Sequence, residues 1–150
     1  MESQNIEKRT INFESSPIPV THDMVEKFCE VTGDRQQFHL DPEAARNSFF
    51  GTMVSPGLLT TSLAIESMWE MYDKLKIFPD HEVIISSSEV KYTKPVEVGD
   101  SVSYKWEMTS SVDKKIKDKD VTIVKWTTEI LNSKKEVVSV IKWGFIYVKK

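Results

Sequence analysis

The chain has 150 residues, a net charge of −3 and a hydrophobic fraction of 39%. This length is typical of one domain with a substantial core, so we expect a single domain over residues 1–150. The small acidic excess gives no electrostatic reason to expect binding to nucleic acid or to an anionic membrane. No apolar stretch approaches the roughly 20 residues that a bilayer span requires. Residues 1–10 are mostly polar and lack the apolar segment of a secretory signal, which predicts a cytoplasmic protein.

A short strand over 10–14 and three helices are predicted in the first half of the chain. The first helix covers Thr21–Val31, with Thr21 as N-cap, and Cys29 on its apolar side is expected to be a buried, unreactive thiol. The second helix begins at Asp41, an N-cap followed by proline and by an acid in the first turn. The third covers 56–76, and its apolar residues wrap most of the way around it, as is typical of a helix buried in the middle of a domain.

After Pro79 the hydrophobic pattern changes to a period of two, which predicts strands. Four strands are expected, over residues 82–92, 101–111, 121–131 and 137–148. The charged run 113–120 is interpreted as a solvated hairpin tip, with phosphate binding as the minor alternative. Helices followed by antiparallel strands indicate an α+β fold, in which a curved antiparallel sheet wraps around the long central helix. An open sheet edge favours pairing between two copies.

The segment Gly33–Asp41 carries the clearest chemical signal. It places a carboxylate at Asp34 and an imidazole at His39, and both groups transfer protons in many enzymes. On a continuous helix, five residues would rotate the two side chains about 140° apart. They converge only if the chain turns between them, and the glycine at the end of the first helix supplies such a break.

This segment resembles the signature of the MaoC-like, (R)-specific enoyl-CoA hydratase family, which runs Gly-Asp-x-Asn-Pro, an aliphatic residue and His-x-Asp. The matching residues are Gly33, Asp34, His39 and Asp41, and the departures are Gln36, Gln37 and Phe38. The similarity continues without a gap to Gly57, with Phe50 at the phenylalanine position of the family and Pro56 in place of a histidine. Residues 90–100 resemble the aromatic-x-x-Pro-Val-x-x-Gly-Asp turn of the same fold.

The resemblance implies a hot-dog fold that hydrates trans-2-enoyl thioesters of coenzyme A or an acyl-carrier protein to (R)-3-hydroxyacyl thioesters, or catalyses the reverse dehydration. It implies that Asp34 and His39 form the acid-base pair and that the backbone N–H of Gly57, at the head of the third helix, holds the enolate oxygen. The residues expected at the substrate are Gln36, Phe38, Phe50, Ser55 and Leu58. No metal or redox cofactor is expected, and the subunits are expected to form a homodimer or a dimer of dimers with the substrate tunnel at the interface.

Other interpretations remain open at this point. Asp34 as a simple turn cap and His39 as an ordinary half-buried histidine would both be structural. A hot-dog thioesterase would use a carboxylate on the central helix, for which Glu66 is the candidate. An acyl-thioester-binding subunit without turnover would share the same fold. A mononuclear iron site made of His39, Asp41 and His81 is disfavoured, because Asp41 is predicted to cap a helix.

Overall fold

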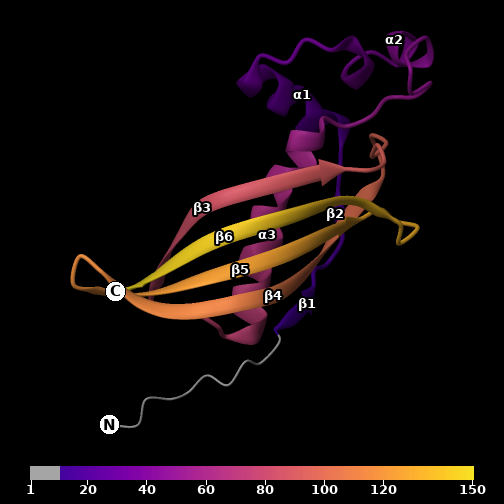
Figure 1. Cartoon of the computed structure of the whole chain (residues 1–150). Coiled ribbons are helices and arrows are strands. Elements are labelled where there is room, and N and C mark those ends of the chain that lie inside the picture. The colour runs from indigo at the N-terminus through magenta and orange to yellow at the C-terminus, as the bar shows by residue number, and fades with distance from the viewer. Residues whose placement is uncertain (1–10) are drawn as a thin grey trace.

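The computed structural model describes residues 11–150, shown as the coloured ribbon in Figure 1. The predictions about residues 1–10, including the missing secretory segment and the start of the strand at residue 10, lie outside the described residues. The elements are β1 (Asn12–Glu14), β2 (Ile18–Pro19), α1 (His22–Thr32), the 3₁₀ helix η1 (Gln37–His39), α2 (Pro42–Arg46), α3 (Gly57–Leu75), β3 (His81–Tyr92), β4 (Ser101–Ile116), β5 (Lys119–Leu131) and β6 (Val137–Lys149).

One antiparallel sheet with the strand order β1-β4-β5-β6-β3 forms the main layer, and β2 also pairs with β4. The long helix α3 crosses one face of this sheet, and α1 and α2 lie beyond one end of it (Figure 1). This arrangement confirms the predicted α+β hot-dog architecture. No helix in the range 11–150 is long and apolar enough to cross a membrane.

The helix α1 begins and ends where the sequence predicts. The side-chain oxygen of Thr21 accepts a hydrogen bond from the N–H of Met24, which satisfies one free donor of the first turn. Gly33 ends the helix in the left-handed region at φ 76°, a conformation that glycine adopts without steric cost. Cys29 is buried as predicted, and its burial, followed by the nearby charge of Asp34, raises the pKa of its thiol.

The helix α3 is less enclosed than its sequence predicts. Met68, Met71 and Tyr72 pack into the core against the sheet. Leu58 and Trp69, however, are 62% and 53% exposed on the opposite side. The prediction of a helix buried on most sides is therefore wrong for this chain alone, because one sheet covers only one side of a helix.

The predicted hairpin tip over 113–120 is also corrected by the structure. The strands β4 and β5 continue into this charged run, and their pairing extends to Ile116 opposite Lys119. Only Lys117 and Asp118 form the turn, with φ of 50° and 63°. The charged composition suggested a loop, whereas backbone pairing with the neighbouring strand maintains the extended conformation.

The core beneath α3 is rich in aromatic side chains from alternate positions of the strands. Trp106 stacks on Trp143 and contacts Trp126 edge to face. Each of these three indole N–H groups has a hydrogen-bond acceptor. Trp106 donates to Ser67, Trp143 donates to Thr128, and Trp126 donates to the hydroxyl of Tyr147. The satisfied polar atoms fix the orientation of the rings, and the bond from Trp106 to Ser67 joins the sheet to the middle of α3.

Candidate active site

The loop after α1 brings Asp34 and His39 together. One carboxylate oxygen of Asp34, Oδ1, accepts a hydrogen bond from the N–H of Gln36 at 3.0 Å. The short helix η1 then turns the chain back, and Oδ2 of Asp34 lies 3.7 Å from Nε2 of His39. This separation is too long for a direct hydrogen bond, yet both atoms are close enough to contact one small molecule between them. The convergence predicted from the glycine break is confirmed.

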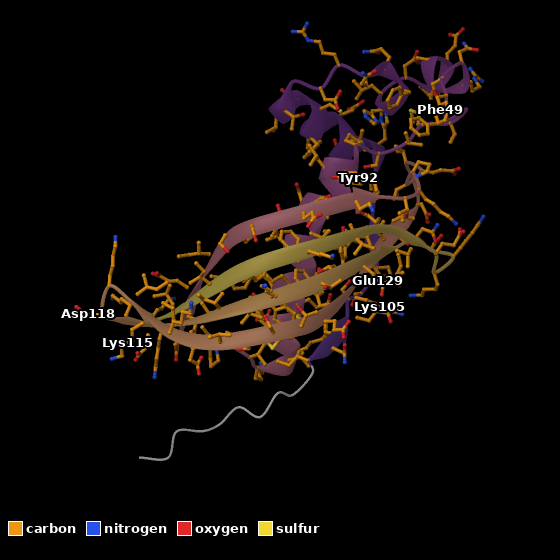
Figure 2. All side chains as sticks on the ribbon, viewed as in Figure 1. Phe49, Tyr92, Lys105, Lys115, Asp118 and Glu129 are labelled. Carbon is orange, nitrogen blue, oxygen red and sulfur yellow. The ribbon has the colours of Figure 1, made fainter. Side chains whose placement is uncertain are left out.

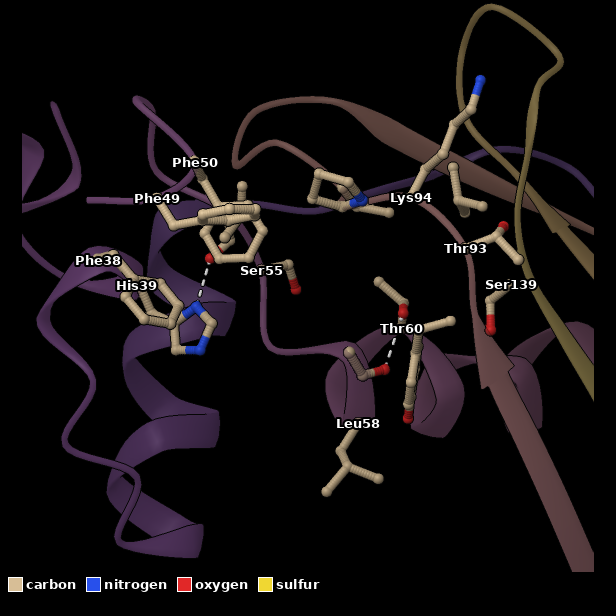
Figure 3. Close-up of a pocket in the computed structure, with 16 residues that line it drawn as sticks. Phe38, His39, Phe49, Phe50, Ser55, Leu58, Thr60, Thr93, Lys94 and Ser139 are labelled. Atoms are coloured by element: carbon tan, nitrogen blue, oxygen red, sulfur yellow. Dashed lines mark hydrogen bonds between the residues drawn. The ribbon is translucent and has the colours of Figure 1, made fainter. Parts of the chain in front are cut away.

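The ring of His39 is buried, and its orientation is fixed by a backbone group. Its Nδ1 hydrogen-bonds the carbonyl oxygen of Val54 (dashed line in Figure 3). A carbonyl only accepts hydrogen bonds, so Nδ1 must hold the hydrogen. In the neutral ring, the lone pair therefore lies on Nε2, the atom that faces Asp34.

The segment before α3 is held in place by backbone contacts with the turn after β3. Ser55 donates its N–H to the carbonyl of Val96 at 2.8 Å, and Val54 forms an isolated bridge with Glu97. Gly57 follows as the first residue of α3. Among the described residues, no acceptor contacts the N–H of Gly57, which lies at the positive end of the helix dipole.

The structure explains why glycine occupies position 57. A Cβ atom there would come within 2.6 Å of Cε1 of Tyr92 and 2.9 Å of its Cδ1, so the aromatic ring fills the space of the missing side chain. Thr61 donates its hydroxyl hydrogen to the carbonyl of Gly57, and the Tyr92 hydroxyl therefore donates to Thr61 Oγ1 at 3.0 Å. The packing of Tyr92 against position 57 thus requires a residue without a side chain there.

A cavity of about 530 Å³ opens between the loop with His39 and the head of α3. This volume lies within the range of roughly 300–1,000 Å³ that small-molecule sites occupy. Its lining residues are Phe38, His39, Phe49, Phe50, Val54, Ser55, Gly57, Leu58, Thr60, Tyr92, Thr93, Lys94, Pro95, Val96, Val138 and Ser139. Figure 3 shows the phenylalanines and His39 on one side and Thr93, Lys94 and Ser139 on the other. The cavity thus offers one aromatic wall and one more polar wall.

Comparison with known families agrees with this geometry. The family model described as MaoC like domain matches residues 2–130, which is most of the chain. The chain belongs to the MaoC-like domain family. Solved structures with the same fold include a MaoC-like dehydratase from Rhodospirillum rubrum, with 22% identity, a TM-score of 0.75 and coverage of 94% of this chain and 92% of that chain. The (R)-hydratase from A. caviae involved in PHA biosynthesis has 22% identity, a TM-score of 0.69 and coverage of 93% and 94%.

Relatives in sequence are named for dehydration of thioesters. One is 3-hydroxyacyl-thioester dehydratase Z of Mycobacterium tuberculosis, 30% identical over 89 residues that make up 59% of this chain and 58% of the relative. Another is 3-hydroxybutyryl-CoA dehydratase of Methylorubrum extorquens, 29% identical over 57% of this chain and 50% of the relative. The chain therefore matches only about half of the length of these relatives.

Most, but not all, of the predicted site residues of this MaoC-like chain line the cavity. The cavity is lined by Phe38, Phe50, Ser55 and Leu58, together with His39 and Gly57. Asp34 and Gln36 are not among its lining residues. Asp34 reaches the site through its contact with His39, and Gln36 contributes its backbone N–H to orient Asp34.

Several lining residues were not expected from sequence. Tyr92, Thr93, Lys94, Pro95 and Val96 belong to the aromatic-x-x-Pro-Val turn, which sequence analysis treated only as a mark of the fold. The position of this turn, directly after a predicted strand, was the one sequence signal that could have indicated its place at the cavity. Val138 and Ser139 lie on the neighbouring strand β6 and carry no motif. Phe49 is 97% exposed beside Phe50, with ring centroids 5.3 Å apart.

The alternative sites find less support in the described residues. The Asp41 carboxylate accepts from the N–H of Ala44 at 3.2 Å, so Asp41 caps α2 as predicted. No cluster of three potential metal ligands occurs within 11–150. Glu66, the candidate for a thioesterase, is exposed on α3 and does not line the cavity.

Proposed function

We propose that this MaoC-like chain is a hydro-lyase that adds water to a trans-2-enoyl thioester, giving an (R)-3-hydroxyacyl thioester, or catalyses the reverse dehydration. The observation that carries the proposal is the pairing of Asp34 Oδ2 with His39 Nε2, 3.7 Å apart beside the cavity. The names of the sequence relatives support the same reaction class. The (R) configuration rests on the family resemblance.

The two side chains are arranged to orient a water molecule. A carboxylate oxygen and the lone pair on Nε2 are both acceptors, so a water between Asp34 and His39 donates both of its hydrogens to them. Its own lone pairs are then directed away from the pair, towards a substrate carbon in the cavity. As the water oxygen bonds to the β-carbon, one member of the pair takes a proton from the water and delivers it to the α-carbon.

The head of α3 supplies the second requirement of the reaction. Charge builds up on the thioester oxygen when the β-carbon is attacked, and a preorganised N–H donor lowers the energy of that enolate. The N–H of Gly57 is available for this purpose, and the dipole of α3 adds to its effect. The overall reaction consumes one water and transfers no electrons, so it requires no redox cofactor, and the proposed acid-base pair acts without a metal.

The carrier of the acyl group is proposed to be coenzyme A or an acyl-carrier protein. The acyl chain would occupy the cavity between Phe38 and Phe50 on one side and the polar residues on the other. We also propose a homodimer that pairs through β3, because β3 is the last strand of the sheet and leaves one edge without a partner strand.

An ultraviolet assay with crotonyl-CoA and a longer trans-2-enoyl-CoA tests the proposal. Hydration removes the conjugated double bond and lowers its absorbance without releasing thiol, so thiol is titrated in the same samples. Loss of absorbance without thiol release is the expected result. Thiol release would instead indicate hydrolysis and direct attention to Glu66, and the absence of both signals with either substrate would contradict the proposed reaction.

A further inference from the structure

The acid-base pair joins two parts of the chain that are held by different elements. Asp34 follows the glycine that ends α1, so its carboxylate moves with the C-terminal end of that helix. The ring of His39 is bonded to the carbonyl of Val54, so it moves with the segment before α3. The separation of 3.7 Å between Asp34 Oδ2 and His39 Nε2 therefore depends on how α1 is fixed against the residues around His39.

The strands supply no hydrogen bond that fixes this part of the chain. The helices α1 and α2 lie beyond one end of the sheet (Figure 1). Figure 2 shows Phe49 in this outlying part, whereas Lys115 and Asp118 mark the hairpin at the opposite end of the sheet. Apolar side chains of α1 pack against the core, but in the described part of the chain no hydrogen bond joins residues 22–41 to a strand.

The backbone hydrogen bonds inside the loop are local. The N–H groups of Leu40 and Asp41 both donate to the carbonyl of Gln37, and the N–H of His39 donates to the carbonyl of Gln36. Each bond joins residues three or four positions apart, so together they give η1 its turn. They do not attach η1 to α1.

The side chain of His22 makes this attachment. His22 is the first residue of α1, and its Nε2 lies 3.2 Å from the carbonyl oxygen of Leu40, the residue after His39. Within the described part of the chain, this is the only hydrogen bond between α1 and residues 36–41. Because α1 is about 16 Å long, and His22 and Asp34 lie at its opposite ends, the loop must return along the helix to form this bond.

The bond from His22 to Leu40 is available in either charge state of the ring. A carbonyl only accepts hydrogen bonds, so Nε2 holds a hydrogen. The other ring nitrogen, Nδ1, lies 3.3 Å from Oε1 of Glu26, one turn further along α1. A ring with hydrogens on both nitrogens satisfies both contacts, and a neutral ring with its hydrogen on Nε2 keeps the bond to Leu40. Both side chains are exposed, so a substitution at either position leaves the core unchanged.

We propose that His22 is a positioning residue for the acid-base pair, because it holds the carbonyl of Leu40 against α1 and so keeps His39 beside Asp34. This inference rests on the proposed hydration reaction. Misplacement of reacting groups by about 1 Å can cost roughly 10²-fold in rate. The thioester itself is proposed to bind in the cavity, which His22 does not line. Loss of the bond should therefore lower kcat and leave KM unchanged.

Two substitutions separate the hydrogen bond from the shape of the ring. His22→Phe keeps a flat ring but loses the donor, and it is expected to lower kcat for hydration of a trans-2-enoyl-CoA about 5- to 10-fold at constant KM. His22→Gln places an amide N–H donor at a similar reach and should stay within about 2-fold of the wild type. Lys27→Met is the matched control, because it removes an ion pair with Asp23 on the same helix that does not involve the loop, and its rate should be unchanged.

Amide hydrogen exchange measures the attachment independently of the reaction. In His22→Phe, the amides of His39, Leu40 and Asp41 should exchange about 5-fold faster or more, because η1 opens more often when it is detached from α1. The amides of α1 should exchange as in the wild type. His22→Gln should restore slow exchange in the loop.

Three results would overturn the role of His22. These are an unchanged kcat in His22→Phe, a kcat in His22→Gln as low as that in His22→Phe, and a loop that exchanges equally fast in His22→Phe and the wild type. A wild type that hydrates no enoyl thioester would contradict the proposed reaction instead. The exchange of the loop amides would then decide by itself whether His22 holds η1 in place.

Discussion

Two regions meet at the cavity, and they contribute different kinds of chemical group. The loop Gly33–Asp41 contributes side chains, the carboxylate of Asp34 and the imidazole of His39. The head of α3 and the segment just before it contribute backbone groups, namely the carbonyl of Val54 that orients His39 and the N–H of Gly57. A substitution in the loop deletes a reactive group, whereas a substitution at the head of α3 leaves the backbone group present and only moves it. The two regions should therefore differ in how strongly they respond to mutation.

The largest effects are expected in the loop. Asp34→Asn and His39→Ala should each lower the rate of hydration by about 10²-fold or more, because each removes one acceptor for the attacking water. Asn keeps an oxygen that accepts the N–H of Gln36, so the loop should keep its shape in Asp34→Asn. Rates are measured by loss of enoyl absorbance, and folding is checked by the thermal unfolding midpoint.

His81→Ala is the control for these variants. His81 lies at the start of β3, and its Nδ1 contacts the carbonyl of Pro79 outside the cavity. Its substitution should leave the rate unchanged. Full activity in Asp34→Asn and His39→Ala would show that the loop has only a structural role and would contradict the proposed mechanism.

An intermediate effect is expected at the head of α3. Gly57→Ala places a methyl group 2.6 Å from Cε1 of Tyr92, so the ring or the helix must shift. Overpacking of this kind costs about 1–3 kcal/mol in the free energy of unfolding. We expect the rate to fall roughly 10-fold, which is a partial loss of one oxyanion contact, because the N–H is displaced and not removed.

Variants of Tyr92 test whether the stability loss in Gly57→Ala comes from a clash between the new methyl group and the Tyr92 ring. Tyr92→Ala removes the ring and should recover part of the stability that Gly57→Ala loses, which a double-mutant cycle measures as a coupling energy. Tyr92→Phe keeps the ring atoms that collide with the new methyl group and should give no recovery. If Gly57→Ala lowered the free energy of unfolding equally with and without the Tyr92 ring, the packing role assigned to this glycine would be contradicted.

The same contrast explains how much of the site could be predicted from sequence. Asp34 and His39 are recognisable because their side chains are themselves the chemistry, and the glycine break at position 33 indicates how they converge. The bond from His39 to the carbonyl of Val54 leaves no sequence signal, since every residue has a carbonyl. The role of Tyr92 against Gly57 depends on contacts between distant segments, and only the fold reveals it.

The fold was predictable to a similar degree and for similar reasons. The caps at Thr21 and Asp41 are local hydrogen bonds between neighbours in sequence, and both are confirmed. The exposed side of α3 at Trp69 and the extension of β4 to Ile116 are not local features. They depend on which neighbouring element is present, and periodicity alone does not encode it.

A third region, remote from both, should affect stability without affecting the reaction. Glu70 on α3 accepts hydrogen bonds from the N–H and hydroxyl of Ser16 and from Lys74. Burial acts to raise the pKa of Glu70, but these hydrogen bonds and the charge of Lys74 together lower it from its ordinary value of 4.5. The segment between β1 and β2 is thus attached to α3 by an ionised carboxylate.

The stability that Glu70 contributes should depend on pH in a defined direction. Because its pKa is lower in the folded chain, the contribution is complete above the ordinary pKa and is lost as the pH falls through the lowered value. Glu70→Gln should therefore destabilise the chain at pH 7 and differ less from the wild type in acid, as measured by urea unfolding.

Glu66→Gln, one turn earlier with an exposed carboxylate, is the matched control and should change neither stability nor its pH dependence. If the difference in the free energy of unfolding between Glu70→Gln and the wild type stayed constant from pH 7 into acid, the charge of Glu70 would not be its cause. The difference would then come from the packing of the amide. The hydration rate of Glu70→Gln should equal that of the wild type, because no part of this contact reaches the cavity.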